Sequence, residues 1–348
     1  MMLNKTLFTF SHAPRLQQLN SLRFLAAAMV GVFHCAFVFS PHSPYLDFLS
    51  LGSDGVYVFF VISGFIIPWS LDQSHYSIEH WGVFMIKRFR RLFPPFVFSL
   101  LCYWIGWWWL HPDHAWESVQ LLLSNLFFLV PFGVGEWVNE IYWTLWVELQ
   151  FYLLVGLIFP VLIHLFPSRS SGIILLLNML SFGSLLLPVE IEKNFILFHL
   201  PYFTLGFIAF QIARIRAIHI THSLSLVLTI ITLWWSLTSL HGLSLSSLFF
   251  AFFTFVIILF FNTTFKFLEW LGEFSYSFYL MHGLIIAWIS LLWDQLNSLA
   301  VSPWLFLLLV QVFAWVFSVI LYHGIEKKSL LWSKKIKYNY APDITRSR

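Results

Sequence analysis

The chain has 348 residues with a formal net charge of +3, and 59% of its residues are hydrophobic, 20% aromatic and only 10% charged. Soluble domains average about a quarter charged residues, so this composition excludes an ordinary soluble domain and indicates a protein with many membrane spans. The two cysteines, Cys35 and Cys102, both lie in apolar runs, which excludes a disulfide framework and metal-ligand spacing. We therefore expect no metal and no nucleic-acid partner, and a lipid bilayer as the surroundings.

Ten stretches are apolar and long enough to cross a bilayer, which takes about 17–25 helical residues each. In chain order they lie near 20–40, 52–71, 94–110, 141–166, 172–188, 196–213, 223–240, 245–262, 274–293 and 303–323. A further apolar piece at 117–131 is short and is interrupted by Ser124 and Asn125. The number of spans therefore depends on whether this piece crosses the membrane.

The distribution of basic residues decides that question, because Lys and Arg accumulate on cytoplasmic loops. With ten spans and both termini cytoplasmic, eighteen of the nineteen Lys and Arg residues lie on the cytoplasmic side and only Lys193 lies outside. If 117–131 also crossed, eight would lie inside and eleven outside. The sequence thus predicts an all-α polytopic membrane protein with about ten transmembrane helices. Residues 117–131 would form a re-entrant or interfacial helix, and 327–348 a basic cytoplasmic tail.

The first span carries two ionisable residues, Arg23 near its cytoplasmic start and His34 deep inside. They are eleven residues apart, nearly three helical turns, so both side chains project from one face about 16 Å apart along the axis. Histidine exchanges a proton near neutral pH, which suits a general base. The structural alternatives are a buried neutral imidazole and an arginine that reaches lipid phosphate.

Residues 77–93 form the most basic segment, and we expect them to make an interfacial amphipathic helix before the third span. Lys87, Arg90 and Arg91 lie opposite an apolar stripe, where they would bind anionic lipid. Arg88 falls at the edge of that stripe. Its side chain is the one we expect to turn toward the protein, where a guanidinium can hold a phosphate with two hydrogen bonds.

Other polar side chains lie inside predicted spans. Glu148 shares a helix face with Tyr152, four residues further along, in the span at 141–166. Ser275, Tyr279 and His282 share one face of the span at 274–293. Polar groups inside a membrane are functional candidates by default, and each has the alternative of a structural hydrogen bond between helices.

Six segments of this chain, in this order, resemble the acyltransferase-3 family of membrane O-acyltransferases, which modify bacterial surface and exported glycans. They are "LNSLRFLAAAMVGVFH", "GVYVFFVISGF", "KRFRRLFPPF", "WTLWVELQFY", "LPYFTLGF" and "LGEFSYSFYLMH". Each segment is a weak signal alone, and their shared order makes the resemblance specific. It covers about residues 19–326, and we expect residues 1–348 to form a single membrane domain without an SGNH esterase-like domain.

The resemblance implies that cytoplasmic acyl-CoA, in the simplest case acetyl-CoA, is the donor. It implies a hydroxyl of a glycan or lipid-linked sugar as the acceptor, and the bacterial cytoplasmic (inner) membrane as the location. Among the residues, it implies that His34 is essential and that Arg23, Arg88 and Arg91 support activity, which we interpret as binding of the acyl-CoA.

One position departs from the family pattern. Family members often carry an acidic residue where this sequence has Tyr57. If that carboxylate orients the histidine, another group must do so here, and Glu148 and Asp54 are the candidates. Ser63 lacks the GxSxG context of a nucleophile, so we expect it to serve helix packing together with Gly64.

These expectations combine into a mechanistic hypothesis. Arg23, Arg88 and Arg91 would hold the phosphates of coenzyme A, and His34 would act as general base on the acceptor hydroxyl. Direct transfer and an acyl-enzyme relay both remain open. The rival classes are a transporter or flippase of a lipid-linked sugar, and a scaffold for glycan assembly. The sequence carries no signal for the oligomeric state.

Overall fold

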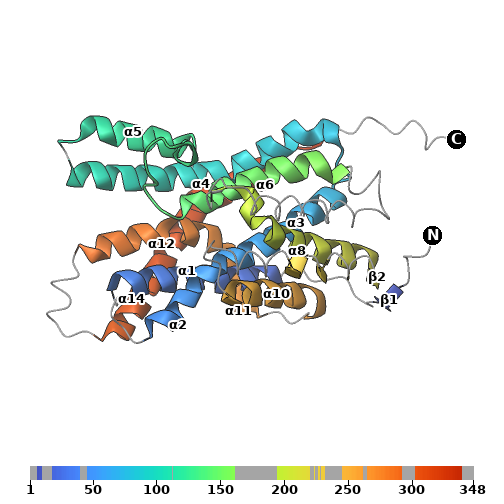
Figure 1. Cartoon of the computed structure of the whole chain (residues 1–348). Coiled ribbons are helices and arrows are strands. Elements are labelled where there is room, and N and C mark those ends of the chain that lie inside the picture. The colour runs from blue at the N-terminus through green and yellow to red at the C-terminus, as the bar shows by residue number, and fades with distance from the viewer. Residues whose placement is uncertain are drawn as a thin grey trace.

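A computed structural model describes residues 6–9, 18–39, 45–111, 113–160, 194–219, 223, 226–227, 229–231, 245–261, 265–291 and 302–338. Its elements are β1 (Thr6–Thr9), α1 (Gln18–Phe39), α2 (Leu46–Ser50), η1 (Leu51–Asp54), α3 (Gly55–Gln73), η2 (Ile78–His80), α4 (Trp81–Leu110), α5 (Ala115–Leu126), η3 (Val130–Phe132), α6 (Tyr142–Pro160), α8 (Ile196–Ile215), β2 (Ala217–His219), α10 (Leu245–Phe260), α11 (Lys266–Glu273), α12 (Ser275–Ser290), α14 (Pro303–Leu321), η5 (Tyr322–Glu326) and α15 (Lys327–Lys334). Figure 1 shows these helices gathered side by side into one elongated bundle.

Six helical segments are long and apolar enough to cross a membrane, within the part of the chain that the structure describes. They are Gln18–Phe37, Leu46–Gln73, Ile78–Leu110, Tyr142–Pro160, Ile196–Ile215 and Trp304–Lys334. The predicted spans near 245–262 and 274–293 correspond to α10 and α12, which have 16 residues each. The predicted span at 172–188 lies outside the described residues, as does most of the one at 223–240. The protein is therefore a helical, multi-pass membrane protein.

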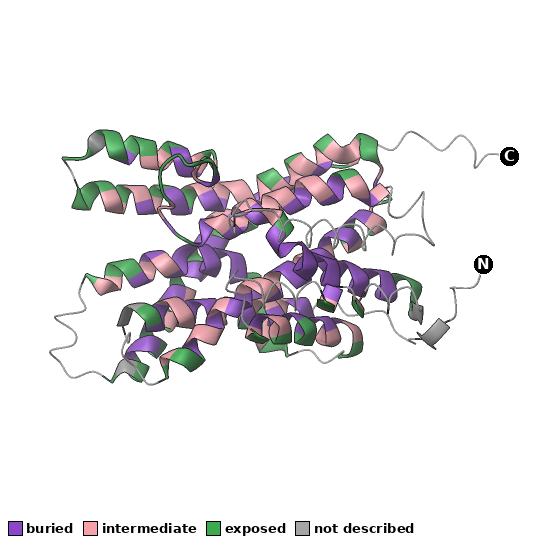
Figure 2. Ribbon diagram, viewed as in Figure 1, coloured by how far each residue is buried: buried purple, intermediate pink, exposed green. Residues whose placement is uncertain are grey.

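The outer surface of the bundle has the composition that lipid contact requires. Along α14, apolar side chains spaced three or four residues apart are at least half exposed, including Leu308, Val312 and Ile320. The opposite face of α14 is buried, with Val310 and Ala314 inside the bundle. Figure 2 shows the same division over the molecule, with buried residues concentrated where helices meet. Exposing so much contiguous apolar surface to water is unfavourable, so these faces indicate contact with lipid chains.

The basic segment 77–93 does not form a helix of its own, which corrects one expectation. After the short turn η2, it continues into the third span as α4, a single helix of 30 residues that contains Pro94 and Pro95. At 1.5 Å per residue, this helix is about 45 Å long. Pro94 and Pro95 lack the backbone N–H that would bond to the preceding turn. They do not end the helix, because α4 packs against α5, α12 and α15. Arg88 and Arg91 are therefore rigidly connected to the span.

The segment predicted as re-entrant or interfacial forms α5, which turns back and runs along the end of α4 (Figure 1). The indole nitrogen of Trp104 on α4 donates a hydrogen bond to the carbonyl oxygen of Ser118 on α5, at 2.8 Å. At its other end, the Asn125 side chain donates to the carbonyl oxygen of Glu136 and accepts from the amide of Val138. The polar residues that interrupt this apolar piece thus hold a hairpin rather than breaking a span.

Helices α3 and α8 approach most closely through glycines. A β-carbon at Gly64 would lie 2.1 Å from the Phe203 carbonyl oxygen, and one at Gly206 would lie 2.0 Å from the Val61 carbonyl oxygen. Only glycine allows backbones this near to each other. This contact confirms the expected packing role of Gly64.

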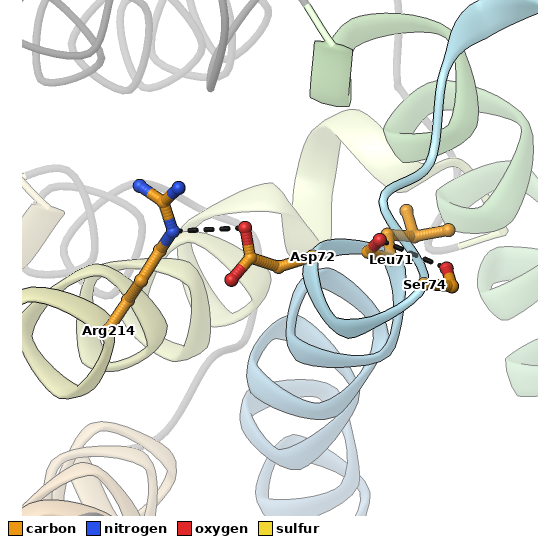
Figure 3. Close-up of polar contacts among 4 residues, drawn as sticks. All are labelled: Leu71, Asp72, Ser74 and Arg214. Carbon is orange, nitrogen blue, oxygen red and sulfur yellow. Dashed lines mark hydrogen bonds and ion pairs between the residues drawn. The ribbon is translucent and has the colours of Figure 1, made fainter. Parts of the chain in front are cut away.

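An ion pair joins α3 and α8 at their ends. Arg214 Nε lies 3.0 Å from Asp72 Oδ1 (Figure 3), and Ser74 caps the same end of α3 by donating to the Leu71 carbonyl. A two-stranded antiparallel sheet of β1 and β2, which the all-α expectation did not contain, lies beyond this end of α8. The C-terminal end of α8 is thus fixed by a charge pair and by strand pairing.

Candidate active site

A cavity of about 520 Å³ lies between α1, α3, α4, α6 and α12, and eight of its polar lining residues were predicted from the sequence as site residues. We call it the arginine cavity. The charged, tyrosine and serine residues that line this cavity are Arg23, Ser63, Ser70, Ser74, Arg88, Arg91, Glu148, Tyr152, Ser275, Tyr276 and Tyr279. The rest of the wall is mostly apolar, from residues such as Phe59 and Ile66. Three guanidinium groups from two helices therefore meet in a space of the size of a small-molecule site.

Within the described part of the chain, none of the three arginines is neutralised by a direct ion pair. Among the described residues, no carboxylate oxygen lies within 4.0 Å of a side-chain nitrogen of Arg23, Arg88 or Arg91. The Arg88 guanidinium instead stacks near the rings of Phe84 and Tyr152, 5.3 and 5.4 Å from their centroids. Partly buried positive charge without a partner is costly, and it is compensated when an anion such as a phosphate binds.

Glu148 lies in the same wall and is held from two helices. The hydroxyl of Tyr152, one turn along α6, donates a very short hydrogen bond to Glu148 Oε1. Ser63 Oγ on α3 donates to the same oxygen at 3.2 Å. Ser63 is therefore a hydrogen-bonding neighbour of Glu148, in addition to preceding the packing glycine. The structure brings Glu148 to Arg88 and Tyr152 and not to His34.

His34 lies outside the arginine cavity and beside a second histidine. The ring centroids of His34 on α1 and His282 on α12 are 5.4 Å apart. His34 accepts or donates no hydrogen bond among the residues that the structure describes, and its ring is only partly buried. The two histidines that the sequence placed on separate spans therefore form one pair, which we call the histidine pair.

Tyr279 stands between the arginine cavity and the histidine pair. It lines the cavity, and its ring centroid is 5.8 Å from that of His282. Its hydroxyl is 2.7 Å from Thr144 Oγ1 on α6, so α6 and α12 are bonded across this point.

Helix α1 connects the two parts of the site. It is uninterrupted from Gln18 to Phe39, so Arg23 in the arginine cavity and His34 in the histidine pair are about 16 Å apart along one axis. The spacing expected from the sequence is thus retained, and the structure adds what each residue faces.

The remaining predicted residues divide between the cavity and other places. Ser275 lines the arginine cavity and is fully buried, and its hydroxyl has no hydrogen-bond partner among the residues that the structure describes. Tyr57 stacks on Tyr202 at 4.3 Å between centroids. Asp54, buried at 3% exposure, interacts electrostatically with both tyrosines. Asp54 and Tyr57 thus belong to the contact between α3 and α8.

Sequence reasoning missed Glu326 in the π-helical turn η5. This side chain is buried at 7% exposure, and its Oε2 accepts hydrogen bonds from the amide and the hydroxyl of Ser277, at 3.1 and 2.5 Å. Its charge interacts with those of Arg23 and Arg91. The signal available was a glutamate three residues beyond the predicted last span at 303–323, and the charge count considered only the Lys and Arg residues of that region. A π-helical turn is itself a frequent mark of a functional site.

A second cavity of about 590 Å³ shares the wall formed by Arg88, Glu148 and Tyr152. It opens between α4 and α6, and its lining is almost wholly apolar, with Phe89, Phe93, Phe96, Phe128 and Trp332 among its residues. Trp332 on α15 also lies under the Arg90 guanidinium, 4.5 Å from the ring centroid. Within the described residues, no group of three or more His, Cys, Asp or Glu side chains could hold a metal ion.

Residues 16–323 match the model of a family described as an acyltransferase domain. Since this match covers most of the chain, the protein belongs to the acyltransferase-3 family. The chain is also similar to an O-acetyl transferase of Shigella phage Sf6, with 31% identity over 188 residues, which make up 50% of this chain and 53% of that protein. The chain therefore spans about half the length of this curated relative. No solved structure matches it.

Proposed function

We propose that this protein is an O-acetyltransferase that moves an acetyl group from acetyl-CoA to a hydroxyl of a cell-surface or lipid-linked glycan. The observation that carries the proposal is the arginine cavity, in which Arg23, Arg88 and Arg91 have no carboxylate within ion-pair distance among the described residues. Coenzyme A is polyanionic, and its phosphates suit this cluster. Family membership and the similarity to a phage O-acetyl transferase support the same chemistry.

The thioester would lie near the histidine pair. Its pantetheine arm would run along α1 from Arg23 to His34, a distance of about 16 Å, past Tyr279. His34 removes the proton from the acceptor hydroxyl as its oxygen attacks the thioester carbonyl. The carbon–sulfur bond then breaks, the ester remains on the acceptor, and coenzyme A leaves as the thiolate, which takes up the proton. An acyl-enzyme relay through His34 is the competing route.

The membrane orientation belongs to the same proposal. We place the arginine cavity on the cytoplasmic side of the bacterial inner membrane, where acetyl-CoA is made, with both termini on that side and ten spans in all. The basic surfaces support this placement, because α15 packs against the basic half of α4, with Arg90 over Trp332 and Lys87 Nζ 4.5 Å from the centroid of Tyr338. Clustered Lys and Arg at one end of a bundle are typical of its cytoplasmic face.

The test is acetyl transfer by purified protein in lipid nanodiscs, with radiolabelled acetyl-CoA and de-esterified polysaccharide from the host cell. We expect His34→Ala to lower transfer about a hundred- to ten-thousandfold, because the general base is lost. Arg23→Ala should instead raise the KM for acetyl-CoA. The controls are His111→Ala at the exposed end of α4 and Arg214→Ala, both outside the site.

Three outcomes would contradict the proposal. Wild-type protein that moves no acetyl group at all would point to the transporter alternative, which flipping of a fluorescent lipid-linked sugar would then reveal. Normal transfer by His34→Ala at normal protein abundance would remove the histidine from the mechanism. Equal effects of Arg23→Ala and Arg214→Ala would remove the arginine cavity as the donor site.

A further inference from the structure

Buried polar atoms without partners occur on and beside the helix turn that carries His282. Tyr103 on α4 is 9% exposed, Asn139 before α6 is 7% exposed, and His282 is fully buried. Among the residues that the structure describes, the Tyr103 hydroxyl, Asn139 Nδ2 and His282 Nε2 each lack a hydrogen-bond partner. Leaving a buried donor or acceptor unpaired costs free energy, and folded proteins pair nearly all of them. Three residues with such atoms at one helix turn therefore indicate a place where a polar ligand completes the structure.

A glycine brings these three residues together. Gly283 follows His282 on α12, and a β-carbon there would lie 2.6 Å from the Tyr103 hydroxyl oxygen. The same β-carbon would lie 3.3 Å from Asn139 Oδ1 and 3.6 Å from Nδ2. The hydroxyl and the amide thus lie against the helix turn that carries His282, whose ring neighbours His34. The charge of Glu140, the residue after Asn139, also acts on His34.

The hydrogen bonds already made fix what the unpaired atoms can offer. His282 Nδ1 is 3.1 Å from the Phe278 carbonyl oxygen, so it carries the proton and Nε2 presents a lone pair. Asn139 Oδ1 accepts from the amide of Ile141 at 3.3 Å, which leaves Nδ2 as the donor of this side chain. The Tyr142 hydroxyl interacts with the Asn139 amide, but it is already bonded to Ser99 Oγ at 2.9 Å. The site therefore offers an acceptor, a donor and a hydroxyl that can act as either.

We infer that Tyr103, Asn139 and His282 bind hydroxyl groups of the glycan acceptor, beside His34. A sugar hydroxyl both donates and accepts, so it can pair with His282 Nε2 and with Asn139 Nδ2 at once. No Lys or Arg is among these groups, and Glu140 brings negative charge, which favours a neutral polyhydroxyl ligand over a phosphate. The inference rests on the proposed function and names the residues that would recognise its acceptor.

Tyr103→Phe gives the sharpest test, because it removes only the unpaired hydroxyl. We expect the KM for de-esterified host polysaccharide to rise about three- to tenfold, the effect of one lost hydrogen bond to substrate. The KM for acetyl-CoA should stay within about twofold, and the melting temperature should not fall, since no protein hydrogen bond is lost. Tyr202→Phe is the matched control, because its buried hydroxyl bonds Ser247 at 2.9 Å, away from the site.

Two more variants protect the test against misfolding. Asn139→Asp keeps the oxygen that accepts from Ile141 but replaces the donor, so it should also raise the acceptor KM. Gly283→Ala should displace the Tyr103 hydroxyl and have the same effect. If Tyr103→Phe and Asn139→Asp transfer acetyl groups to polysaccharide with wild-type kinetics, or if Tyr103→Phe lowers the melting temperature as Tyr202→Phe does, the subsite is wrong. If wild-type protein transfers no acetyl group, the proposed function itself fails.

Discussion

At the scale of single residues, the arginines of α4 differ in which side chains they contact. The Arg88 guanidinium lies over the rings of Phe84 and Tyr152 and lines the arginine cavity. Arg90, two residues later, faces the other way and stacks on Trp332. A planar guanidinium can stack on a ring and still present two donors to a phosphate, whereas a lysine ammonium is a point charge. The identity of the residue at position 88 therefore matters as much as its charge.

Arg88→Lys tests this point. We expect it to raise the KM for acetyl-CoA about tenfold, because the stacked fork that meets the phosphate is lost while the charge is kept. Arg90→Lys keeps the same charge on the opposite side of α4 and should change that KM by less than about twofold. Initial rates at varied acetyl-CoA give both values, and similar effects for the two variants would contradict a phosphate contact by Arg88.

A contact between two side chains could be predicted from the sequence only where both residues lie on one helix. The shared face of Glu148 and Tyr152 followed from helical spacing, and their hydrogen bond confirms it. The bond from Ser63 to Glu148 joins positions 85 residues apart, which spacing within one helix cannot reveal. Tyr103 was hidden for another reason, because a tyrosine among tryptophans near the end of a span has the appearance of an interfacial anchor.

At the scale of elements, the contact between α3 and α8 holds one wall of the arginine cavity, because α3 carries Ser63. Gly206→Ala would place a methyl group 2.0 Å from the Val61 carbonyl oxygen, and backbone cannot move aside as a side chain can. We expect a loss of about 2–3 kcal/mol in stability, within the range for overpacked sites. Thermal unfolding in detergent measures it.

Gly82→Ala is the matched control for Gly206→Ala. A β-carbon at Gly82 on α4 would meet nothing within 4 Å, so the replacement should be neutral or stabilise the helix by up to about 1 kcal/mol. A stable Gly206→Ala protein with wild-type transfer would show that α3 and α8 can separate at no cost.

Helix α4 was wrongly divided from the sequence. The basic, amphipathic pattern of residues 77–93 suggested an interfacial helix separate from the span at 94–110, whereas α4 is one helix from Trp81 to Leu110. In the folded protein, neighbouring helices hold both halves in line. Tertiary packing of this kind has no local signature, so the continuity of α4 could not be predicted from spacing.

At the scale of the whole molecule, the proposed topology can be tested with single cysteines. In a background with Cys35→Ala and Cys102→Ser, Trp116→Cys on α5 and Lys334→Cys on α15 both place an exposed thiol. We expect an impermeant maleimide to label position 116 in intact spheroplasts and position 334 only after permeabilisation. Labelling of both positions in intact spheroplasts would overturn the proposed orientation.

The number of spans was the property of the whole chain most open to sequence reasoning, because charge counting needs no contacts. Residues 172–188 and most of 223–240 lie outside the described part, so the count of ten stays a prediction. Which helices pack against each other was harder to predict from the sequence. The pairing of His34 with His282 joins the first predicted span to the ninth, and nothing within either segment names its partner.

The unbroken helix α1 fixes the distance between Arg23 and His34. Because Arg23 and His34 lie on one helix, the distance between the proposed phosphate-binding end and the proposed reacting end cannot adjust to a shorter donor. Acetyl thioesters of cysteamine or pantetheine, which carry the same reactive carbonyl without the nucleotide, would lack the anchor that sets the thioester beside the histidines. We expect such truncated donors to lose turnover as well as affinity, because anchoring far from the reaction is what positions the bond that breaks.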